Sequence, residues 1–409
     1  MRRNLHARAM ARRADASAGA HLRELQAPES FKWHEPLQSL LNFVPFGLFC
    51  VALLSVFFAS LTPLSAWEIR SFQGRDYLSF KEVSAFYGLQ PASSSSQGAK
   101  KFSGAGREIV IASNSRELFI NGIAHWLAFP VMEHEGELFL SRLDLGKTVE
   151  PALHPERIPG FPVVDTVVLD AGHGGTDSGA SSPYQVEKNF SLDVVRRIRN
   201  GLQKAGVPVV LTRNTDEFVE LQDRAAIASH LKNSIFVSIH FNATDGNRSA
   251  NGLEIYCVAP RGAPSTAYEQ LSERDMIGEN GNEHDIHSFA LANTIYHSMQ
   301  GSMKMTDRGV KRARFAVLRL TGVPAVLIEG GFLTNPGEAR NIASRAWRDN
   351  YAESIVRGIL EYMNLAALRT PPRQVGDYRS GRGPAPSPLS VPATAPSSSV
   401  SLRDLPASD

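Results

Sequence analysis

Short apolar runs that alternate with helical patterns dominate the chain from residue 163 onward, and this alternation constrains the fold more than any other feature. The strand patterns lie at 163–170, 207–213, 234–242, 252–258 and 324–332. The helical patterns lie at 187–206, 220–230, 285–303 and 346–364. Runs such as VVLTR and AVLIE are apolar on successive residues, which is typical of strands that helices cover on both faces. The sequence therefore predicts an α/β fold over 163–366, with a largely parallel central sheet flanked by helices.

A small α+β domain is predicted to precede this fold, over residues 67–150. The spacing of a short helix occurs in RDYLSFKEVSAFYGL, and strand patterns occur in GREIVIAS, RELFINGI and ELFLSRLDLG, with Asn121 and Gly122 as a turn. YLSFKEV and LFINGIAHWLAFP resemble the small N-terminal domain of copper amine oxidases and of many bacterial envelope proteins. The resemblance implies an accessory module and does not imply copper. A proline-marked linker, 151–162, follows, and the Pro- and Ser-rich tail, 367–409, is predicted to be disordered.

The N-terminal residues 1–66 have the pattern of an export signal. Five arginines lie within the first 13 residues, the apolar run LFCVALLSVFFASL occupies 48–61, and small residues lie near Ala66. The alternative is a retained anchor in the inner membrane formed by residues 43–61, which are just long enough to span a bilayer. Both interpretations place the rest of the chain outside the cytoplasm, in the periplasm or cell envelope. A net charge of +2 gives no reason to expect a nucleic-acid partner.

Four ionisable side chains lie where ligands bind in open α/β sheets, at the carboxyl ends of strands or at the start of the following helix. His173 follows the first strand inside the glycine-rich stretch LDAGHGGTDSGA, and Glu187 begins the next helical pattern. His240 ends SIFVSIH, and Glu329 ends PAVLIE. A buried carboxylate such as Glu329 needs a cation or hydrogen bonds, because an unpaired charge is costly to bury. The fold is therefore predicted to bring these four residues together.

Two imidazoles and one carboxylate form a catalytic zinc set with an open fourth position. A second carboxylate that is not a ligand is the general base that such a site needs. The competing interpretation, a phosphate-binding loop, is disfavoured because GHGGTDSG lacks the lysine and Ser/Thr of a P-loop. The HExxH zinc motif is also absent.

The domain resembles the zinc-dependent N-acetylmuramoyl-L-alanine amidases of the amidase-3 family, the bacterial cell-wall amidases. The resemblance covers about 163–364 and rests on VVLDAGHGGTDSGA, EKNFSLDV, LTRNTD, SIHFNA and PAVLIEGGFLTNPGE, in the family order. It implies that His173, Glu187 and His240 bind Zn²⁺ and that Glu329 is the catalytic glutamate. It also implies a reaction, hydrolysis of the amide between N-acetylmuramic acid and L-alanine in peptidoglycan, for cell-wall remodelling or daughter-cell separation.

Two other functions compete with this one. A catalytically spent cell-wall-binding protein is disfavoured because all four key residues are present, and a zinc exopeptidase on free peptides is disfavoured by the family motifs. Asn242, just past His240, is a candidate substrate-binding residue, whereas Arg213 and Arg224 are interpreted as structural. The long segment 259–285 lies between a strand and a helix. In some relatives an insertion near this point blocks the zinc site until an activator protein removes it, so this segment is either such a plug or a solvated loop of the substrate groove.

Overall fold

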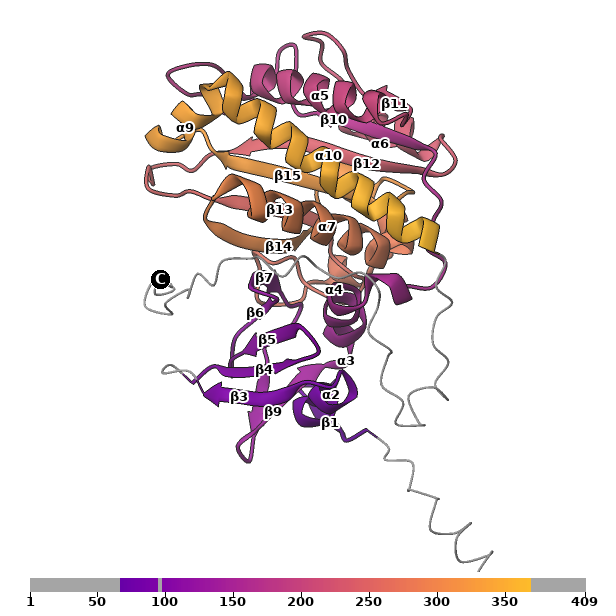
Figure 1. Cartoon of the computed structure of the whole chain (residues 1–409), viewed down its shortest axis with the longest axis vertical. Coiled ribbons are helices and arrows are strands. Elements are labelled where there is room, and N and C mark those ends of the chain that lie inside the picture. Colours follow the sequence, from indigo (N-terminus) through magenta and orange to yellow (C-terminus); the bar gives the residue numbers. More distant parts are fainter. Residues whose placement is uncertain (1–66, 95–97, 369–409) are drawn as a thin grey trace, which may run out of the picture. The chain divides into compact units, whose positions relative to one another are not determined.

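The computed structural model of the chain describes residues 67–94 and 98–368 (Figure 1). The signal or anchor predicted within 1–66, with its apolar stretch 43–61, lies outside the described residues, as does the tail from residue 369 onward. All described residues belong to one compact unit. Among the helices of the described part, none is long and apolar enough to cross a membrane.

The strands and helices follow one another along the chain as follows. The strands are β1 (Ile69–Phe72), β2 (Arg75–Ser79), β3 (Gln90–Ser94), β4 (Lys100–Gly104), β5 (Arg107–Ile111), β6 (Glu117–Ile120), β7 (Ile123–Trp126), β8 (Met132–His134), β9 (Glu137–Ser141), β10 (Thr166–Ala171), β11 (Val209–Leu211), β12 (Ser234–Asn242), β13 (Leu253–Val258), β14 (Asp307–Ala313) and β15 (Ala325–Phe332). The helices are α2 (Phe80–Phe86), α3 (Arg142–Asp144), α4 (Glu150–Leu153), α5 (Glu187–Lys204), α6 (Leu221–Ser229), α7 (Asp285–Met303), α8 (Ala316–Arg319), α9 (Pro336–Ala343) and α10 (Arg345–Leu368). Tighter or wider turns form η1 (Leu145–Val149), η2 (Pro155–Arg157), η3 (Glu273–Met276) and η4 (Asn280–His284).

An eleven-stranded sheet organises the chain, in the order β11-β10-β12-β15-β13-β14-β7-β6-β5-β4-β3. The first four strands are parallel, which confirms the parallel core predicted from the apolar runs. β13 then runs antiparallel to β15, and β14 lies parallel to β13. The sheet is therefore mixed, and the chain reverses direction in space at a strand whose sequence pattern gives no sign of it.

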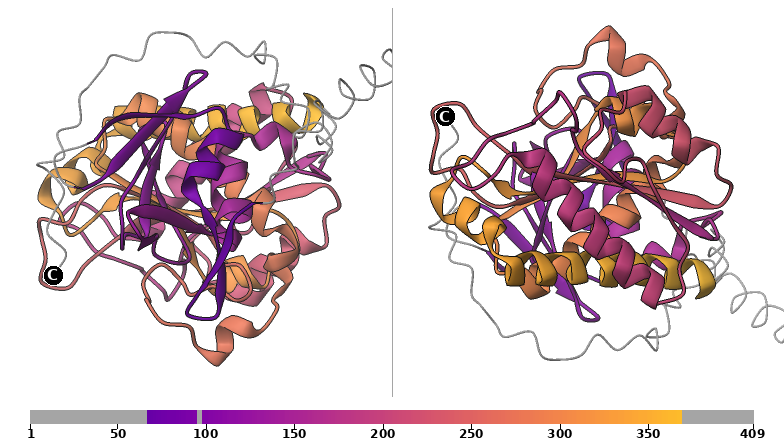
Figure 2. Two further views of the ribbon diagram at one scale, coloured as in Figure 1. Left: turned by 90° about the horizontal axis from the view of Figure 1, so that it is seen from below. Right: turned by 90° about the horizontal axis from the view of Figure 1, so that it is seen from above.

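Helices cover both faces of the parallel strands. Val167 and Leu169 pack into the larger core on the face of α5, α7 and α10, whereas Val168 packs into a second core on the face of α6 and α8. All three side chains are fully buried, and each such burial contributes about 1.5–3 kcal/mol. Figure 2 shows α10 running beside α5. This covering explains why successive residues of β10 are apolar.

The N-terminal strands form part of the large sheet and a second, four-stranded sheet of order β1-β2-β9-β8. The Asn121–Gly122 turn between β6 and β7 is confirmed, with φ angles of 52° and 78°. The helix predicted over 75–89 was wrong in its first third, because β2 occupies Arg75–Ser79 and α2 starts only at Phe80. Ser79 caps α2 by accepting a hydrogen bond from the Glu82 N–H.

The predicted linker, 151–162, contains the helical turns of α4 and η2, and Leu153, His154 and Ile158 are buried. β7 pairs with β14, so the large sheet continues from the N-terminal strands into the parallel core. The domain boundaries at 150 and 163 stay a prediction. At the other end, α10 extends to Leu368, two residues past the predicted end of the catalytic domain at residue 366.

Candidate metal centre

His173 has an unusual backbone conformation on the loop that follows β10. Its φ angle of 60° lies in the left-handed region that non-glycine residues seldom adopt. Two buried arginines hold this loop by donating to its carbonyl oxygens: Arg213 to those of Ala171 (2.9 Å) and Gly172 (2.7 Å), and Arg224 to that of His173 (2.7 Å). These bonds compensate for the strained backbone. They also support the structural interpretation of both arginines.

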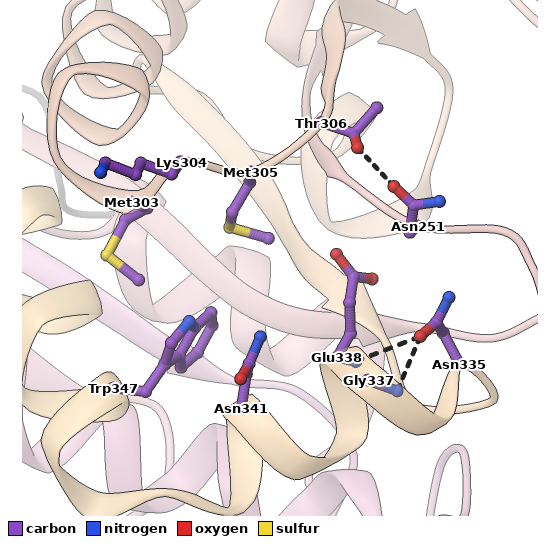
Figure 3. Close-up of a pocket in the computed structure, with 10 residues that line it drawn as sticks. All are labelled: Asn251, Met303, Lys304, Met305, Thr306, Asn335, Gly337, Glu338, Asn341 and Trp347. Atoms are coloured by element: carbon purple, nitrogen blue, oxygen red, sulfur yellow. Dashed lines mark hydrogen bonds between the residues drawn. The ribbon is translucent and has the colours of Figure 1, made fainter.

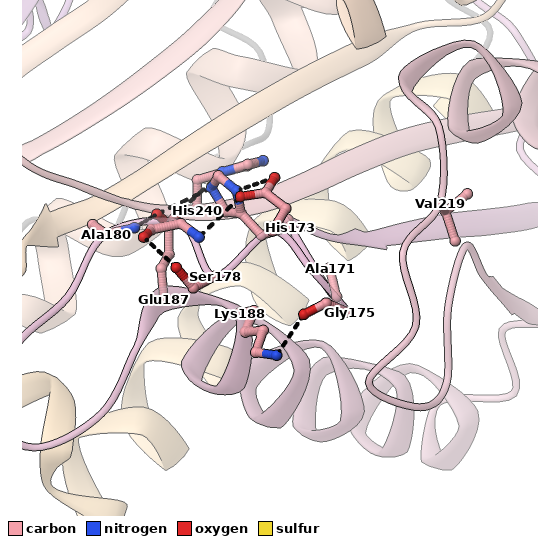
Figure 4. Close-up of polar contacts among 12 residues, drawn as sticks. Ala171, His173, Gly175, Ser178, Ala180, Glu187, Lys188, Val219 and His240 are labelled. Carbon is pink, nitrogen blue, oxygen red and sulfur yellow. Dashed lines mark hydrogen bonds and ion pairs between the residues drawn. The ribbon is translucent and has the colours of Figure 1, made fainter.

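Three side chains from three elements meet at this loop (Figure 4). The Nε2 atom of His173 lies 3.1 Å from one carboxylate oxygen of Glu187, and the Nδ1 atom of His240 lies 2.9 Å from the other. One donor atom from each residue can be chosen so that all three lie within 4.8 Å of one another. Glu187 is 4% exposed. Burial opposes its ionisation, but hydrogen bonds from His173 and His240 lower its pKa below the usual value.

Two glycines leave the space that these side chains occupy. A Cβ atom on Gly172 would lie 2.3 Å from Cε1 of His240, and one on Gly179 would lie 2.6 Å from both Glu187 and His173. No side chain fits at either position without displacing the imidazoles or the carboxylate. The glycines of LDAGHGGTDSGA therefore serve close packing around the histidines, as well as a sharp turn.

Asp177 fixes the orientation of His173. Its carboxylate lies 2.7 Å from Nδ1 of the imidazole and accepts a hydrogen bond from it, which orients the ring so that Nε2 points toward Glu187. Sequence reasoning missed this residue. The available signal was an aspartate four residues beyond the histidine within the same glycine-rich stretch.

Glu329 lies next to the three-residue cluster on β15, in register with His240 on β12. The side chain is partly buried, and its Oε2 atom has no hydrogen-bond partner among the described residues. Burial, together with the nearby carboxylates of Glu187 and Glu254, raises the pKa of Glu329 well above its usual value. The structure thus places all four side chains together.

The donor set fits a zinc ion. Two imidazole nitrogens and one carboxylate oxygen are the types of ligand that catalytic zinc sites use, with one position left for water. The neighbouring Oε2 of Glu329 is a buried acceptor that makes no other hydrogen bond within the described structure. Such an atom can accept a hydrogen bond from a water molecule beside the cluster.

Comparison with known proteins gives the family of this chain. The family model described as N-acetylmuramoyl-L-alanine amidase (Amidase_3) matches residues 167–361. The amidase AmiA of Escherichia coli K12 is 32% identical over 222 residues, which are 48% of this chain and 76% of AmiA. The chain belongs to the amidase-3 family of N-acetylmuramoyl-L-alanine amidases.

Other relatives of this amidase-3 chain differ from it in length. AmiC of Escherichia coli O6:H1 is 33% identical over 246 residues, and the match covers 54% of this chain but only 58% of AmiC. The solved catalytic domain of CwlV, an amidase from Bacillus (Paenibacillus) polymyxa var. colistinus, is 33% identical. That match covers 49% of this chain and 99% of CwlV, with a TM-score of 0.41. The region that the family model matches contains the candidate metal centre.

A second polar network of this amidase-3 chain adjoins Glu329. Glu254 on β13 is the cross-strand partner of Glu329, is 2% exposed, and bonds Arg308 and Lys311. Asn242, the predicted substrate-binding residue, donates its amide to Glu254 at 3.4 Å. Its role toward substrate stays a prediction. Sequence reasoning missed Glu254, because the direction of β13 could not be deduced.

Neither interpretation of segment 259–285 agrees with the structure. β13 is antiparallel to β15, so the chain leaves β13 at the edge of the sheet opposite to the edge that carries His240 and Glu329. The segment contacts that far edge of the sheet: the Thr266 N–H donates a hydrogen bond to the carbonyl oxygen of Arg312, and Asp275 forms an ion pair with Arg314. The segment is neither a plug over the candidate metal centre nor a wall of its groove.

Proposed function

We propose that this chain is a zinc-dependent amidase that hydrolyses the bond between the lactyl group of N-acetylmuramic acid and L-alanine in peptidoglycan. The observation that carries the proposal is the partly buried side chain of Glu329, which lies beside the cluster of His173, Glu187 and His240. Its buried Oε2 atom has no hydrogen-bond partner in the described structure. Family membership supplies the substrate class. Bound zinc would supply Lewis-acid polarisation of the carbonyl and a lowered pKa for water.

The protein groups have separate tasks. Asp177 orients the imidazole of His173. The two carboxylate oxygens of Glu187 each lie close to one imidazole nitrogen, so Glu187 can bind a cation together with both histidines. Glu329 takes a proton from the attacking water and returns it to the departing amine of L-alanine. Its raised pKa suits this exchange, because a general base works best when its pKa approaches the working pH. Arg213 and Arg224 keep the loop in place and move no proton.

The location and partners follow from the same proposal. Cell-wall amidases act outside the cytoplasm, and the apolar run at 48–61 behind an arginine-rich head has the pattern of an export signal. Peptidoglycan is the partner. An activator protein stays a prediction, and since the 259–285 segment does not cover the site, this segment gives no reason to expect one.

Substitution of Glu329 tests the proposal. Glu329→Gln keeps the shape of the side chain and removes its basicity, so zinc content measured by mass spectrometry should equal that of wild type. Turnover of purified sacculi should fall roughly 10²–10⁴-fold, the usual contribution of a positioned general base. A variant that loses zinc would make Glu329 a ligand, and one that retains full turnover would make it structural.

The products and the ligand variants complete the experiment. His173→Ala and His240→Ala should each lose bound zinc and activity together, because two remaining ligands hold the metal weakly. Product masses from wild type should show stem peptides with a free L-alanine N-terminus. Wild type that binds sacculi without releasing them would indicate a spent wall-binding protein, and release of single amino acids from free peptides would indicate an exopeptidase.

A further inference from the structure

A second feature of the surface adjoins the candidate metal centre. A cavity of about 390 Å³ opens between the loop before α5, the loop after β12 and the start of α9. Its lining includes Ser181, Tyr184, Arg248, Thr334 and Arg340. The volume is within the range of small-ligand sites. It is distinct from the cavity in Figure 3, which lies on the other side of the α9 N-terminus and is lined by Met303, Met305 and Trp347.

The walls of this cavity come from the three segments that carry Glu187, His240 and Glu329. Ser181 follows Ala180, whose N–H donates to the Glu187 carboxylate at 2.9 Å. Thr244 lies four residues after His240, and Thr334 lies five residues after Glu329. The N–H of Thr244 donates to the hydroxyl of Thr334, which joins two of the walls. The walls of the cavity therefore belong to the same chain segments that carry the residues of the candidate site.

Two arginines give this cavity its charge. Arg248 and Arg340 are exposed, and within the described structure neither forms an ion pair or a side-chain hydrogen bond. Asp245 also lines the cavity and pairs with neither of them. By contrast, Arg197 and Arg348 nearby on α5 and α10 share the carboxylate of Asp193. An unpaired guanidinium in a cavity is suited to bind a carboxylate.

Both arginines project from fixed backbone. Asn335 caps α9 by accepting from the N–H groups of Gly337 and Glu338 (Figure 3), and the Glu338 carboxylate bonds the backbone of Phe332 at the end of β15. Arg340 is two residues further along this helix. On the opposite wall, the Asn247 side chain accepts three hydrogen bonds from Ser249 and Ala250, and so shapes the turn that contains Arg248.

We propose that this cavity binds the free α-carboxylate of the D-glutamyl residue that follows L-alanine in the stem peptide. The inference rests on the proposed function. Because D-glutamate is linked through its side chain, its α-carboxylate stays ionised unless the wall is amidated. It lies two residues from the scissile bond, which is about 7 Å of extended chain. A cavity walled by residues that follow His240 and Glu329 in the sequence is placed to receive it, and Tyr184, 48% exposed, offers an apolar surface to the peptide.

Paired substrates test the proposal on the zinc-loaded full chain. The substrates are two muramyl peptides that differ only at the second residue, D-glutamate in one and D-isoglutamine in the other. Wild type should show a roughly tenfold higher kcat/KM for the free carboxylate, mainly through a lower KM. Arg340→Gln and Arg248→Gln should each reduce this preference, and the double variant should abolish it. Arg345→Gln, an exposed arginine on α10 outside the cavity, is the matched control.

Two outcomes would overturn the subsite, and a third separates it from the proposed function. Equal kcat/KM for both substrates in wild type, or an unchanged preference in the double variant, would remove D-glutamate as the occupant. Absence of cleavage of either muramyl peptide by wild type would contradict the proposed function. Calorimetric binding of the stem peptides alone then decides the subsite: tighter binding of the free-carboxylate peptide, lost in the double variant, supports it, and equal binding overturns it.

Discussion

Asp170 connects the elements that carry two of the candidate ligands. It is 1% exposed at the end of β10, and its carboxylate pairs with Arg224 at 2.8 Å. The hydroxyls of Thr212 and Ser238 each donate to it at 2.6 Å. Burial alone would raise its pKa, but the charge of Arg224 and these hydrogen bonds lower the pKa below the usual value. One ionised aspartate therefore supports the loop of His173 and the strand of His240.

The pH dependence of stability should reflect this aspartate. Because the pKa of Asp170 is lower in the folded state than the unfolded value of about 3.9, its stabilisation is complete above that pH. It is lost as the pH falls through the folded-state pKa. Asp170→Asn should lower the free energy of unfolding at pH 7 by about 3–5 kcal/mol, since Arg224 is left buried without its charge partner.

Denaturant unfolding at several pH values checks this prediction. The loss caused by Asp170→Asn should shrink toward acid pH, where the wild type also loses the interaction. Asp223→Asn, on the exposed side of α6, is the control and should change stability by less than about 1 kcal/mol. An equal loss at pH 7 and in acid would show that the charge of Asp170 is not the cause.

At the level of residues, the candidate site was predictable because its members end strands. His173, His240 and Glu329 follow apolar runs, and parallel strands bring their carboxyl ends to one edge. Glu254 was not predictable, because it reaches the same place on a strand that runs the other way. The roles of the four residues stay predictions until the variants are measured.

At the level of elements, segment 259–285 is held by the N-terminal part of the chain. Arg116 donates one guanidinium nitrogen to the carbonyl oxygens of Thr266 (3.4 Å) and Tyr268 (2.7 Å). Leu271 packs against a cluster that includes Tyr77 and Phe129. Burial lowers the pKa of Arg116 below its usual value. The segment therefore packs between the N-terminal strands and the far edge of the sheet, and it does not cover the candidate metal centre.

Removal of this guanidinium should loosen the segment. Arg116→Ala should speed amide hydrogen exchange at residues 265–270 and cost about 1.5–3 kcal/mol of stability, the value of hydrogen bonds to a charged group. Zinc content and turnover should stay at wild-type levels. Arg142→Ala, whose side chain is 68% exposed, is the control. If amide hydrogen exchange at 265–270 in Arg116→Ala equals that of wild type, Arg116 does not hold the segment. A large rise in turnover would contradict the statement that the segment does not cover the candidate metal centre.

The elements that sequence reasoning missed are those whose polar residues are buried. β14 reads DRGVKRA, which has no apolar run, yet Arg312 is 3% exposed over the ring of Phe289 and Lys311 pairs with Glu254. When the inward-facing residues of a strand are charged and form ion pairs, the sequence shows no alternation of apolar and polar residues, and the strand is not detected. Long apolar elements such as β12, predicted at 234–242, were located without error.

At the level of the whole molecule, the ladder between β7 and β14 joins residues far apart in the sequence. The Ala124 N–H donates to Asp307 at 2.9 Å, and the indole of Trp126 donates to the carbonyl of Arg308 at 3.1 Å. The parallel core was predictable from its apolar runs. This pairing was not, because neither strand has a pattern that specifies its partner.

Gly309 offers a test of the ladder. A Cβ atom at this position would lie 2.6 Å from the carbonyl oxygen of Ala124, with φ at 85°. Gly309→Ala should cost about 1–2 kcal/mol for the left-handed backbone and a further 1–3 kcal/mol for forcing β7 away from β14. Calorimetry should show a lower Tm or a transition split in two.

Gly206 provides the matched control. Its φ angle is 79°, and a Cβ atom there meets nothing within 4 Å. Gly206→Ala should therefore cost only the backbone contribution and keep a single transition. If the two variants lose the same free energy of unfolding, the contact between β7 and β14 contributes nothing to stability.

The β7–β14 ladder also limits the distance over which the candidate metal centre can move. A catalytic domain on a flexible tether sweeps a sphere around its point of attachment and meets any bond within it. Backbone hydrogen bonds of one continuous sheet allow no such sweep. Anything that the N-terminal strands bind would lie at one distance and one angle from the candidate metal centre, so the choice of the bond to be cleaved would depend on spacing as well as on chemistry. A pull on the N-terminal strands would pass through the ladder to the strands that hold His240 and Glu329.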